Sequence, residues 1–186
     1  MDLKDVPVQQ AVSAWLLILS FPIFAVGGIL YTGRAIWKWP AAGSPAFLAW
    51  ERGFVMAALL TAVLGLIQLE RILEAAGDHI LALSGLALFL AGSAAVIFAE
   101  TYYISRQEGL YAPVVVFVVL AFLGQALIGL SVLRTGLLPG WVGWVAVVWS
   151  LGWLVVLPIA RPHDIYYPWL HYIPPLLYGI ALLSAR

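Results

Sequence analysis

The chain has 186 residues, of which 64% are hydrophobic and only 10% are charged. Because a soluble globular domain carries about 25% charged residues, this composition excludes an ordinary soluble fold. The nine basic and nine acidic residues cancel, so no nucleic-acid partner is indicated. Cysteine is absent, which excludes disulfides, thiolate nucleophiles and Cys-ligated metal centres.

Six stretches contain no Asp, Glu, Lys or Arg: residues 6–33, 53–69, 80–99, 109–133, 135–160 and 165–185. A helix rises about 1.5 Å per residue and the hydrocarbon core is about 30 Å thick, so about 20 apolar residues span it. Five of the six stretches reach that length. We therefore expect an all-α integral membrane protein, with residues 1–186 forming one transmembrane domain, a bundle of six transmembrane helices with short loops.

The expected helices cover, in chain order, about residues 11–31, 51–75, 79–103, 111–134, 141–160 and 165–185. Between the second and third, Gly77 suits a helix C-cap and Asp78 an N-cap. In the last helix, Pro174 and Pro175 have no backbone N–H, so two helical hydrogen bonds cannot form. We therefore expect a bend there.

Small residues inside these helices indicate where neighbouring helices approach closely in lipid. We expect four of them to face other helices: Gly85, Gly92, Gly124 and Gly129.

Six crossings place both termini on one side of the membrane, which we call side A, together with the turns near residues 76 and 135. The loops 32–50, 104–110 and 161–164 lie on the opposite side, side B. Side B carries five basic residues (Arg34, Lys38, Arg52, Arg106, Arg161) and side A four (Lys4, Arg71, Arg134, Arg186). The positive-inside rule therefore favours side B as cytoplasmic and both termini as non-cytoplasmic.

Two ionisable side chains are expected below the headgroups on side B. Glu100 comes about two helical turns before Arg106, and His171 lies about two turns into the last helix. Intramembrane ionisable groups are costly and usually face the bundle interior or a wet cavity. The simplest alternative is that Glu100 pairs with Arg106 or Arg52, and that His171 hydrogen-bonds a carbonyl freed by the two prolines.

If a ligand-binding pocket exists, we expect it to open toward side B, between the helices at 51–75, 79–103 and 165–185. Its expected lining residues are Arg52, Glu100, Tyr103, His171 and Tyr172.

Metal and haem chemistry receive little support from the sequence. No HxxxH, HExxH or Asp-rich motif occurs, so no metal site and no catalytic residue are assigned. His163 and His171 are eight residues apart and do not share a helix face. We predict no cofactor, although a single axial His171 for haem or chlorophyll stays open.

Three function classes remain, and the first is favoured. It is a non-catalytic accessory subunit, or a binder of lipid-like or isoprenoid molecules, whose partners are membrane lipids and also other membrane subunits or further copies of itself. The second is a small oligomeric transporter or channel. The third is an intramembrane lipid-modifying enzyme that uses Glu100 and His171. The abundance of apolar and aromatic surface favours the first class, since catalysis needs a denser polar cluster.

Overall fold

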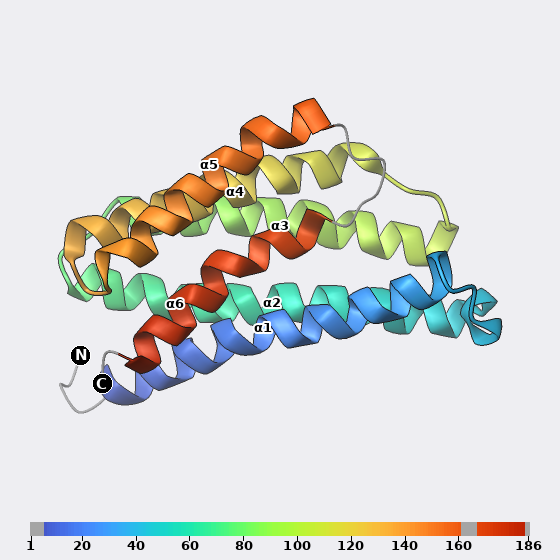
Figure 1. Ribbon diagram of the computed structural model, residues 1–186, viewed down its shortest axis with the longest axis horizontal. Coiled ribbons are helices and arrows are strands. Elements are labelled where there is room, and N and C mark those ends of the chain that lie inside the picture. Colours follow the sequence, from blue (N-terminus) through green and yellow to red (C-terminus); the bar gives the residue numbers. More distant parts are fainter. Residues whose placement is uncertain (1–5, 161–166, 185–186) are drawn as a thin grey trace.

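The computed structural model describes residues 6–160 and 167–184, and within these ranges the chain is helical and contains no β-strand (Figure 1). The all-α fold class is therefore confirmed. Six α-helices are present in the described ranges: α1 (Val6–Ala35), α2 (Pro45–Ala75), α3 (Leu81–Arg106), α4 (Tyr111–Thr135), α5 (Gly140–Ala160) and α6 (Ile173–Ser184). Two short 3-10 helices, η1 (Pro40–Gly43) and η2 (Tyr167–Tyr172), precede α2 and α6.

Five helices, α1 to α5, are long and apolar enough to cross a membrane. Their outward surfaces carry large, exposed apolar side chains. For example, Leu60 is 51% exposed and Val148 is 64% exposed. In water such surfaces would be costly, whereas acyl chains cover them without penalty. The chain is thus a multi-pass membrane protein.

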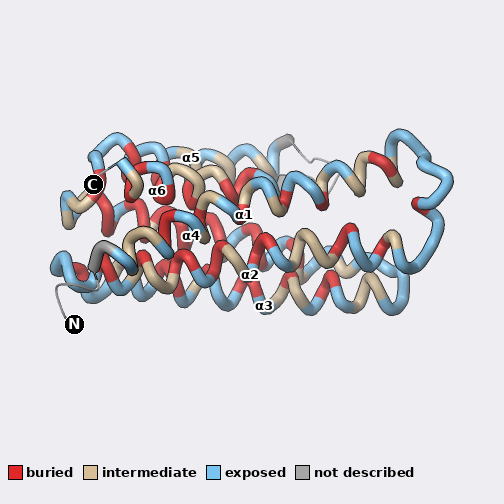
Figure 2. Tube along the Cα trace, turned by 90° about the horizontal axis from the view of Figure 1, so that it is seen from below, coloured by how far each residue is buried: buried red, intermediate tan, exposed pale blue. Residues whose placement is uncertain are grey.

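The helices form a closed ring in chain order. Each helix packs against the next one along the chain, and α6 completes the ring by packing on α1. Consecutive helices run in opposite directions, so that α1 begins and α6 ends at the same end of the bundle (Figure 1). Buried and exposed positions alternate around each helix (Figure 2), as expected when one face meets the bundle and the other meets lipid.

Small residues bring the helices together, as the sequence predicted. A Cβ atom added at Gly85 would lie 2.6 Å from the carbonyl oxygen of Gly124, and one added at Gly124 would lie 2.5 Å from that of Gly85. Added Cβ atoms would lie 3.2 Å from Leu120 at Gly92 and 3.0 Å from Ala146 at Gly129. All four predicted glycines therefore face neighbouring helices, and backbone contact at this range is possible only without side chains.

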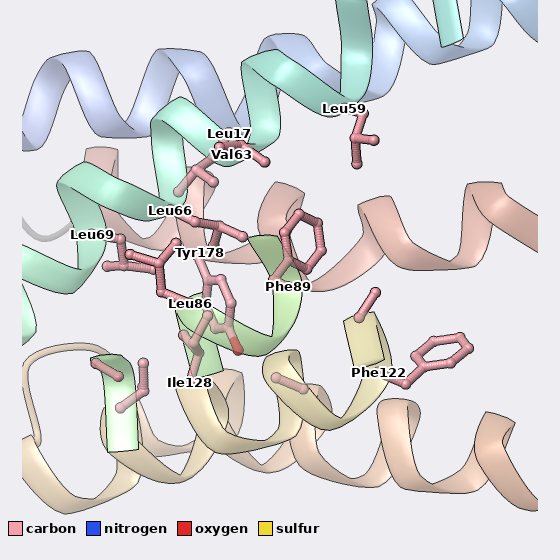
Figure 3. Packing of buried hydrophobic residues seen from close by; sticks show 14 of the residues in the cluster. Leu17, Leu59, Val63, Leu66, Leu69, Leu86, Phe89, Phe122, Ile128 and Tyr178 are labelled. Atoms are coloured by element: carbon pink, nitrogen blue, oxygen red, sulfur yellow. The ribbon is translucent and has the colours of Figure 1, made fainter. Parts of the chain in front are cut away.

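The core between the helices is apolar and closely packed (Figure 3). Leu17 of α1, Leu66 of α2 and Phe89 of α3 are at most 1% exposed, and Tyr178 of α6 is fully buried among the same cluster. The same cluster contains Phe122 of α4 and Val142 of α5, so all six helices share one core, and α6 is held in the ring although it is the shortest helix.

The loop expected at 32–50 is mostly helical, which corrects two predicted boundaries. α1 continues to Ala35, and α2 begins at Pro45 instead of near residue 51. The hydroxyl of Ser44 accepts a hydrogen bond from the backbone N–H of Phe47 at 3.2 Å. A serine N-cap followed by proline at the first helical position is a strong start signal. Because charge-free length was the criterion for the prediction, this signal was missed.

The last predicted helix, 165–185, is also corrected. Residues 161–166 and 185–186 lie outside the described residues, and the described part is η2 followed by the 12-residue α6. Pro174 and Pro175 occupy the first turn of α6, where the missing N–H groups have no intrahelical partner to lose. The two prolines therefore begin an α-helix after a tighter segment, instead of bending one continuous helix.

The turn between α2 and α3 uses both residues that the sequence predicted, although Ile80, and not Asp78, is the N-cap residue of α3. Gly77 has a positive φ of 101°, a conformation that suits glycine. The Asp78 carboxylate accepts hydrogen bonds from the backbone N–H groups of residues 80–82 at 3.3, 3.2 and 2.8 Å. Burial alone would raise the pKa of Asp78, but the Ser131 hydroxyl and these N–H groups favour the charged form and hold the pKa below its ordinary value.

Candidate functional site

Four charged side chains form one continuous network near the side-B end of the bundle. Arg34 of α1 forms a bidentate ion pair with Glu51 of α2, in which Nε donates to Oε2 at 2.6 Å and Nη2 donates to Oε1 at 2.9 Å. Arg52 lies next along α2, and its Nε is 3.2 Å from Glu51 Oε1, the oxygen that also accepts from Arg34 Nη2. Its Nη1 donates to both Glu100 oxygens, at 3.2 and 3.0 Å. Three helices are therefore joined by alternating positive and negative groups.

This network is almost completely buried. Glu51 is 1% exposed, Glu100 is 6% exposed and Arg52 is 7% exposed, while only the Arg34 side chain reaches 24%. Isolated charges at this depth would be very costly, so the pairing is what permits their burial. Of the two partners that the sequence offered for Glu100, the structure selects Arg52, and Arg106 is exposed at the end of α3.

Aromatic rings lie against both arginines of the network. The guanidinium carbon of Arg52 lies 4.7 Å from the centroid of the Tyr103 ring, and that of Arg34 lies 5.3 Å from the centroid of the Tyr31 ring. Cation–π contacts at these distances strengthen when water is excluded. The tyrosines therefore help to hold the guanidinium groups in place inside the bundle.

A pocket of about 240 Å³ opens beside the Arg52–Glu100 pair, between α2, α3 and the start of α4. One part of its lining is polar, from Arg52, Glu100 and Tyr103. The rest is almost entirely apolar: Ala99, Gly109, Leu110, Tyr111 and Val114. We call this cavity the Arg52 pocket. Its two-part lining suits a molecule with one polar end and one apolar end.

A second pocket, of about 320 Å³, also has Tyr103 in its lining. It is lined by Arg34, Ala42, Gly43, Ser44, Leu48, Tyr103 and Gln107. Tyr103 thus lines both pockets, and the second one borders the η1 segment and is less apolar than the Arg52 pocket.

The structure brings together three of the five predicted site residues. Arg52, Glu100 and Tyr103 line the Arg52 pocket. Tyr172 does not line it; its ring stacks on Phe24 of α1 with centroids 4.7 Å apart. Helix α4, and not α6, supplies the third wall of the pocket.

His171 lies apart from the pocket, inside the core. Its ring is between Phe117 and Phe122 of α4, with centroid distances of 4.8 and 3.9 Å. It is 1% exposed, and neither ring nitrogen has a hydrogen-bond partner among the described residues. A carboxylate–imidazole pair between Glu100 and His171 is therefore not formed.

The carbonyls freed by the double proline are bonded by other side chains. In an α-helix the carbonyls of Leu170 and His171 would accept from residues 174 and 175, which are prolines and have no N–H. Trp149 Nε1 of α5 donates to the Leu170 carbonyl at 2.9 Å. Gln125 Nε2 of α4 donates to the His171 carbonyl at 2.6 Å. The backbone of His171 is thus used, whereas the sequence had suggested that its ring would bond a freed carbonyl.

These two hydrogen bonds explain how η2 can lie inside the bundle. Leu170, His171 and Tyr172 are consecutive, and all are at most 3% exposed. Neighbouring residues of a 3-10 helix point in three directions, so their joint burial means that protein surrounds the segment. Irregular backbone at membrane depth is tolerated only under such cover. Gln125 and Trp149 thus supply the hydrogen bonds that let η2 lie there.

Among residues 6–160 and 167–184, no group of three or more His, Asp or Glu side chains lies close enough together to hold a metal ion.

An apolar groove along α5 has almost no polar surface. It is lined by Trp144, Val145, Val148, Trp149, Gly152, Trp153 and Val156. It faces outward on the helix and suits bulk acyl chains. The Arg52 pocket is therefore the best candidate site in the described part of the chain.

Comparison with known proteins adds no further constraint, since no family model, curated protein or solved structure matches the chain.

Proposed function

We propose that this multi-pass membrane protein holds a lipid-like molecule in the Arg52 pocket and acts as a non-catalytic binding protein or accessory subunit. The observation that carries the proposal is the combination of a buried ion pair with an apolar wall in one cavity. Ligand pockets are mostly apolar with a few fixed polar groups that orient the ligand. An amphipathic molecule would place its polar end at Arg52 and Glu100 and its chain along Leu110 and Val114.

The charged groups of the site support binding more than catalysis. A catalytic acid or base needs a free position toward its substrate and an oriented neighbour. Glu51 is held on both oxygens by Arg34, and Glu100 is held on both oxygens by one nitrogen of Arg52. His171, the other candidate base, is enclosed by phenylalanine rings away from the pocket.

The proposed topology has six crossings, with η2 and α6 together forming the last one. A 3-10 helix rises about 2.0 Å per residue and an α-helix about 1.5 Å, so 6 and 12 residues give about 30 Å. This length matches the hydrocarbon core. Both termini then lie on side A, and the Lys and Arg distribution favours side B as cytoplasmic.

The topology is tested by introducing single cysteines at Lys38 and at Gly77, in a chain without native cysteine. We expect a membrane-impermeant thiol reagent to label the two positions from opposite faces of sealed cells. Labelling of both from one face would overturn the six-crossing arrangement.

The function is tested by filling the pocket. Val114 lines the pocket and is 7% exposed, whereas Val116, two residues away on the same helix, is 45% exposed to lipid. We expect Val114→Trp to remove tightly held lipid from the detergent-purified protein, measured by mass spectrometry of the extracted lipids. The matched control Val116→Trp should retain it. Equal lipid content in both variants and the parent protein would contradict the proposal, and solute flux or lipid turnover in liposomes would favour a transporter or an enzyme instead.

A further inference from the structure

The charges around the Arg52 pocket cancel, which restricts the chemistry of its ligand. Arg34 and Arg52 contribute two positive charges, and Glu51 and Glu100 contribute two negative charges, all within one bonded network. A ligand with a net charge would therefore add an uncompensated charge to a nearly buried site. Such a charge costs several kcal/mol in a low-dielectric interior. The balance favours a ligand whose polar end is uncharged.

Hydrogen-bond donors remain unused on Arg52. Its Nη1 alone contacts Glu100, in contrast to the two-nitrogen fork that Arg34 makes with Glu51. Arg52 Nε is buried and lies 3.2 Å from Glu51 Oε1, so it is closed to a ligand. Nη2 makes no hydrogen bond with the described residues. The side chain is more than nine-tenths buried and lines the pocket. Nη2 is therefore the nitrogen that Arg52 can offer to a ligand without giving up Glu100.

The start of α4 adds more donors at the same cavity. Gly109, Leu110 and Tyr111 line the pocket, and Leu110 is the N-cap residue of this 25-residue helix with no side-chain hydrogen bond to cap it. The first N–H groups of a helix have no intrahelical partner and carry a partial positive charge. The start of α4 therefore places backbone donors beside Glu100, whose two oxygens already accept from Arg52.

The size of the pocket limits how much of a ligand it encloses. Pockets that enclose a whole drug-sized molecule measure about 300–1,000 Å³, and the Arg52 pocket measures about 240 Å³. It can enclose a polar end and the first part of a chain. The rest would leave past Tyr111, which is 64% exposed, onto the lipid-facing surface of α4 near Val115, which is 41% exposed.

We infer that the ligand of the Arg52 pocket is a neutral lipid whose polar end presents carbonyl oxygens, the chemistry shared by diacylglycerols and isoprenoid quinones. Its carbonyl oxygens would accept from Arg52 and from the start of α4, and its chain would extend into the bilayer. This inference rests on the proposed function, because it specifies the ligand of that same site.

Binding to defined lipids tests the inference. The full-length protein in detergent is stripped of lipid and titrated with dioleoylglycerol, a short-chain isoprenoid quinone, dioleoyl phosphatidylglycerol and dioleoyl phosphatidylcholine, with bound lipid counted by native mass spectrometry. We expect one of the two neutral lipids to bind at least about tenfold more tightly than both phospholipids, a difference of about 1.4 kcal/mol. The two neutral arms identify which source is used. Equal or tighter binding of either phospholipid would overturn the inference.

A conservative variant checks the donor argument without removing the buried charge. Arg52→Lys keeps a cation next to Glu100 but loses the second donor nitrogen. We expect neutral-lipid binding to weaken by about 3- to 10-fold, the worth of one hydrogen bond. The exposed Arg106→Lys is the matched control and should leave binding unchanged. Unchanged binding by Arg52→Lys would refute the role of Arg52 as a hydrogen-bond donor to the lipid. If the lysine variant does not fold, Tyr103→Phe tests the pocket independently.

The failure of this inference and the failure of the proposed function are distinguishable. Preference for a phospholipid, abolished by Val114→Trp but not by Val116→Trp, leaves a lipid site and removes only its neutral chemistry. Absence of any lipid binding that depends on Val114 removes the proposed function itself.

Discussion

Breaking the Arg52–Glu100 pair should destabilise the bundle much more than removing both partners. The Arg52 side chain is 9% exposed, the Glu100 side chain is 8% exposed, and their closest atoms are 3.0 Å apart. At an effective dielectric constant of about 20, opposite charges at this distance attract by about 5 kcal/mol. Desolvation offsets part of that attraction. The loss of Arg52 leaves Glu100 buried without a partner among the described residues, and the loss of Glu100 leaves Arg52 only the Glu51 oxygen that it shares with Arg34, at a cost of about 3–5 kcal/mol.

The prediction is a double-mutant cycle. Arg52→Met and Glu100→Leu should each lower the free energy of unfolding by about 3–5 kcal/mol, and the double variant should lower it by less than either one. Unfolding in mixed micelles of mild detergent and sodium dodecyl sulfate gives the free energies. Arg106→Met, at an exposed position of α3, is the control and should change stability by less than about 0.5 kcal/mol. Additive single effects below about 1 kcal/mol would refute the view that burial of this pair constrains α2 and α3.

Three further perturbations test the packing and the polar contacts. Gly124→Ala should destabilise the protein by about 1–3 kcal/mol in the same unfolding assay because the new Cβ would lie 2.5 Å from a carbonyl oxygen. The control Gly152→Ala, whose Cβ would have no neighbouring atom within 4 Å, should leave stability unchanged. Equal effects would contradict the close approach of α3 and α4. Gln125→Leu should lower the free energy of unfolding by about 1–2 kcal/mol because it leaves a buried carbonyl unpaired. The control Ser93→Ala should lower it by less, since the Ser93 hydroxyl bonds only the carbonyl four residues back in its own helix. The reverse order would show that the Gln125 hydrogen bond is unimportant. Asp78 has a lowered pKa, so its stabilisation of the folded state is complete above the unfolded-state pKa of about 3.9 and is lost as the pH falls through the folded-state pKa. The unfolding free energies of Asp78→Asn and the parent protein should therefore differ at pH 7 and converge in acid. A difference that does not depend on pH would contradict this.

Composition and charge spacing predicted the membrane bundle because the bilayer imposes one requirement on every crossing, an apolar length of about 20 residues. The same criterion failed at the last helix. The charge-free run 165–185 predicts one helix, yet residues 167–172 form η2 and the α-helix begins only at Ile173. The double proline was the available signal, but its consequence depended on donors from Gln125 and Trp149, which are distant in sequence.

The candidate site was predictable only in part, for a similar reason. Glu100 stood out because an acidic group below the headgroups needs a partner, and Arg52 was one of two partners at a suitable depth. Glu51 was expected only as the first residue of the helix at 51–75, and its ion pair with Arg34 depends on how α1 and α2 are joined through η1. His171 stood out by the same logic as Glu100. A neutral imidazole can be buried without a charged partner, however, and aromatic rings enclose it.

The most direct test of the central claim is to map where a photoactivatable lipid analogue attaches to the protein. A diazirine placed near the polar end of a neutral diacylglycerol is activated in nanodiscs, and the modified peptides are identified by mass spectrometry. The account predicts saturable labelling within residues 99–103 and 109–114, the two segments that supply most of the lining of the Arg52 pocket, and its loss on addition of unlabelled lipid. Labelling along the α5 groove at Trp144 and Trp153 should not saturate. Labelling that is spread evenly over the outward helix faces and resists competition would contradict the account.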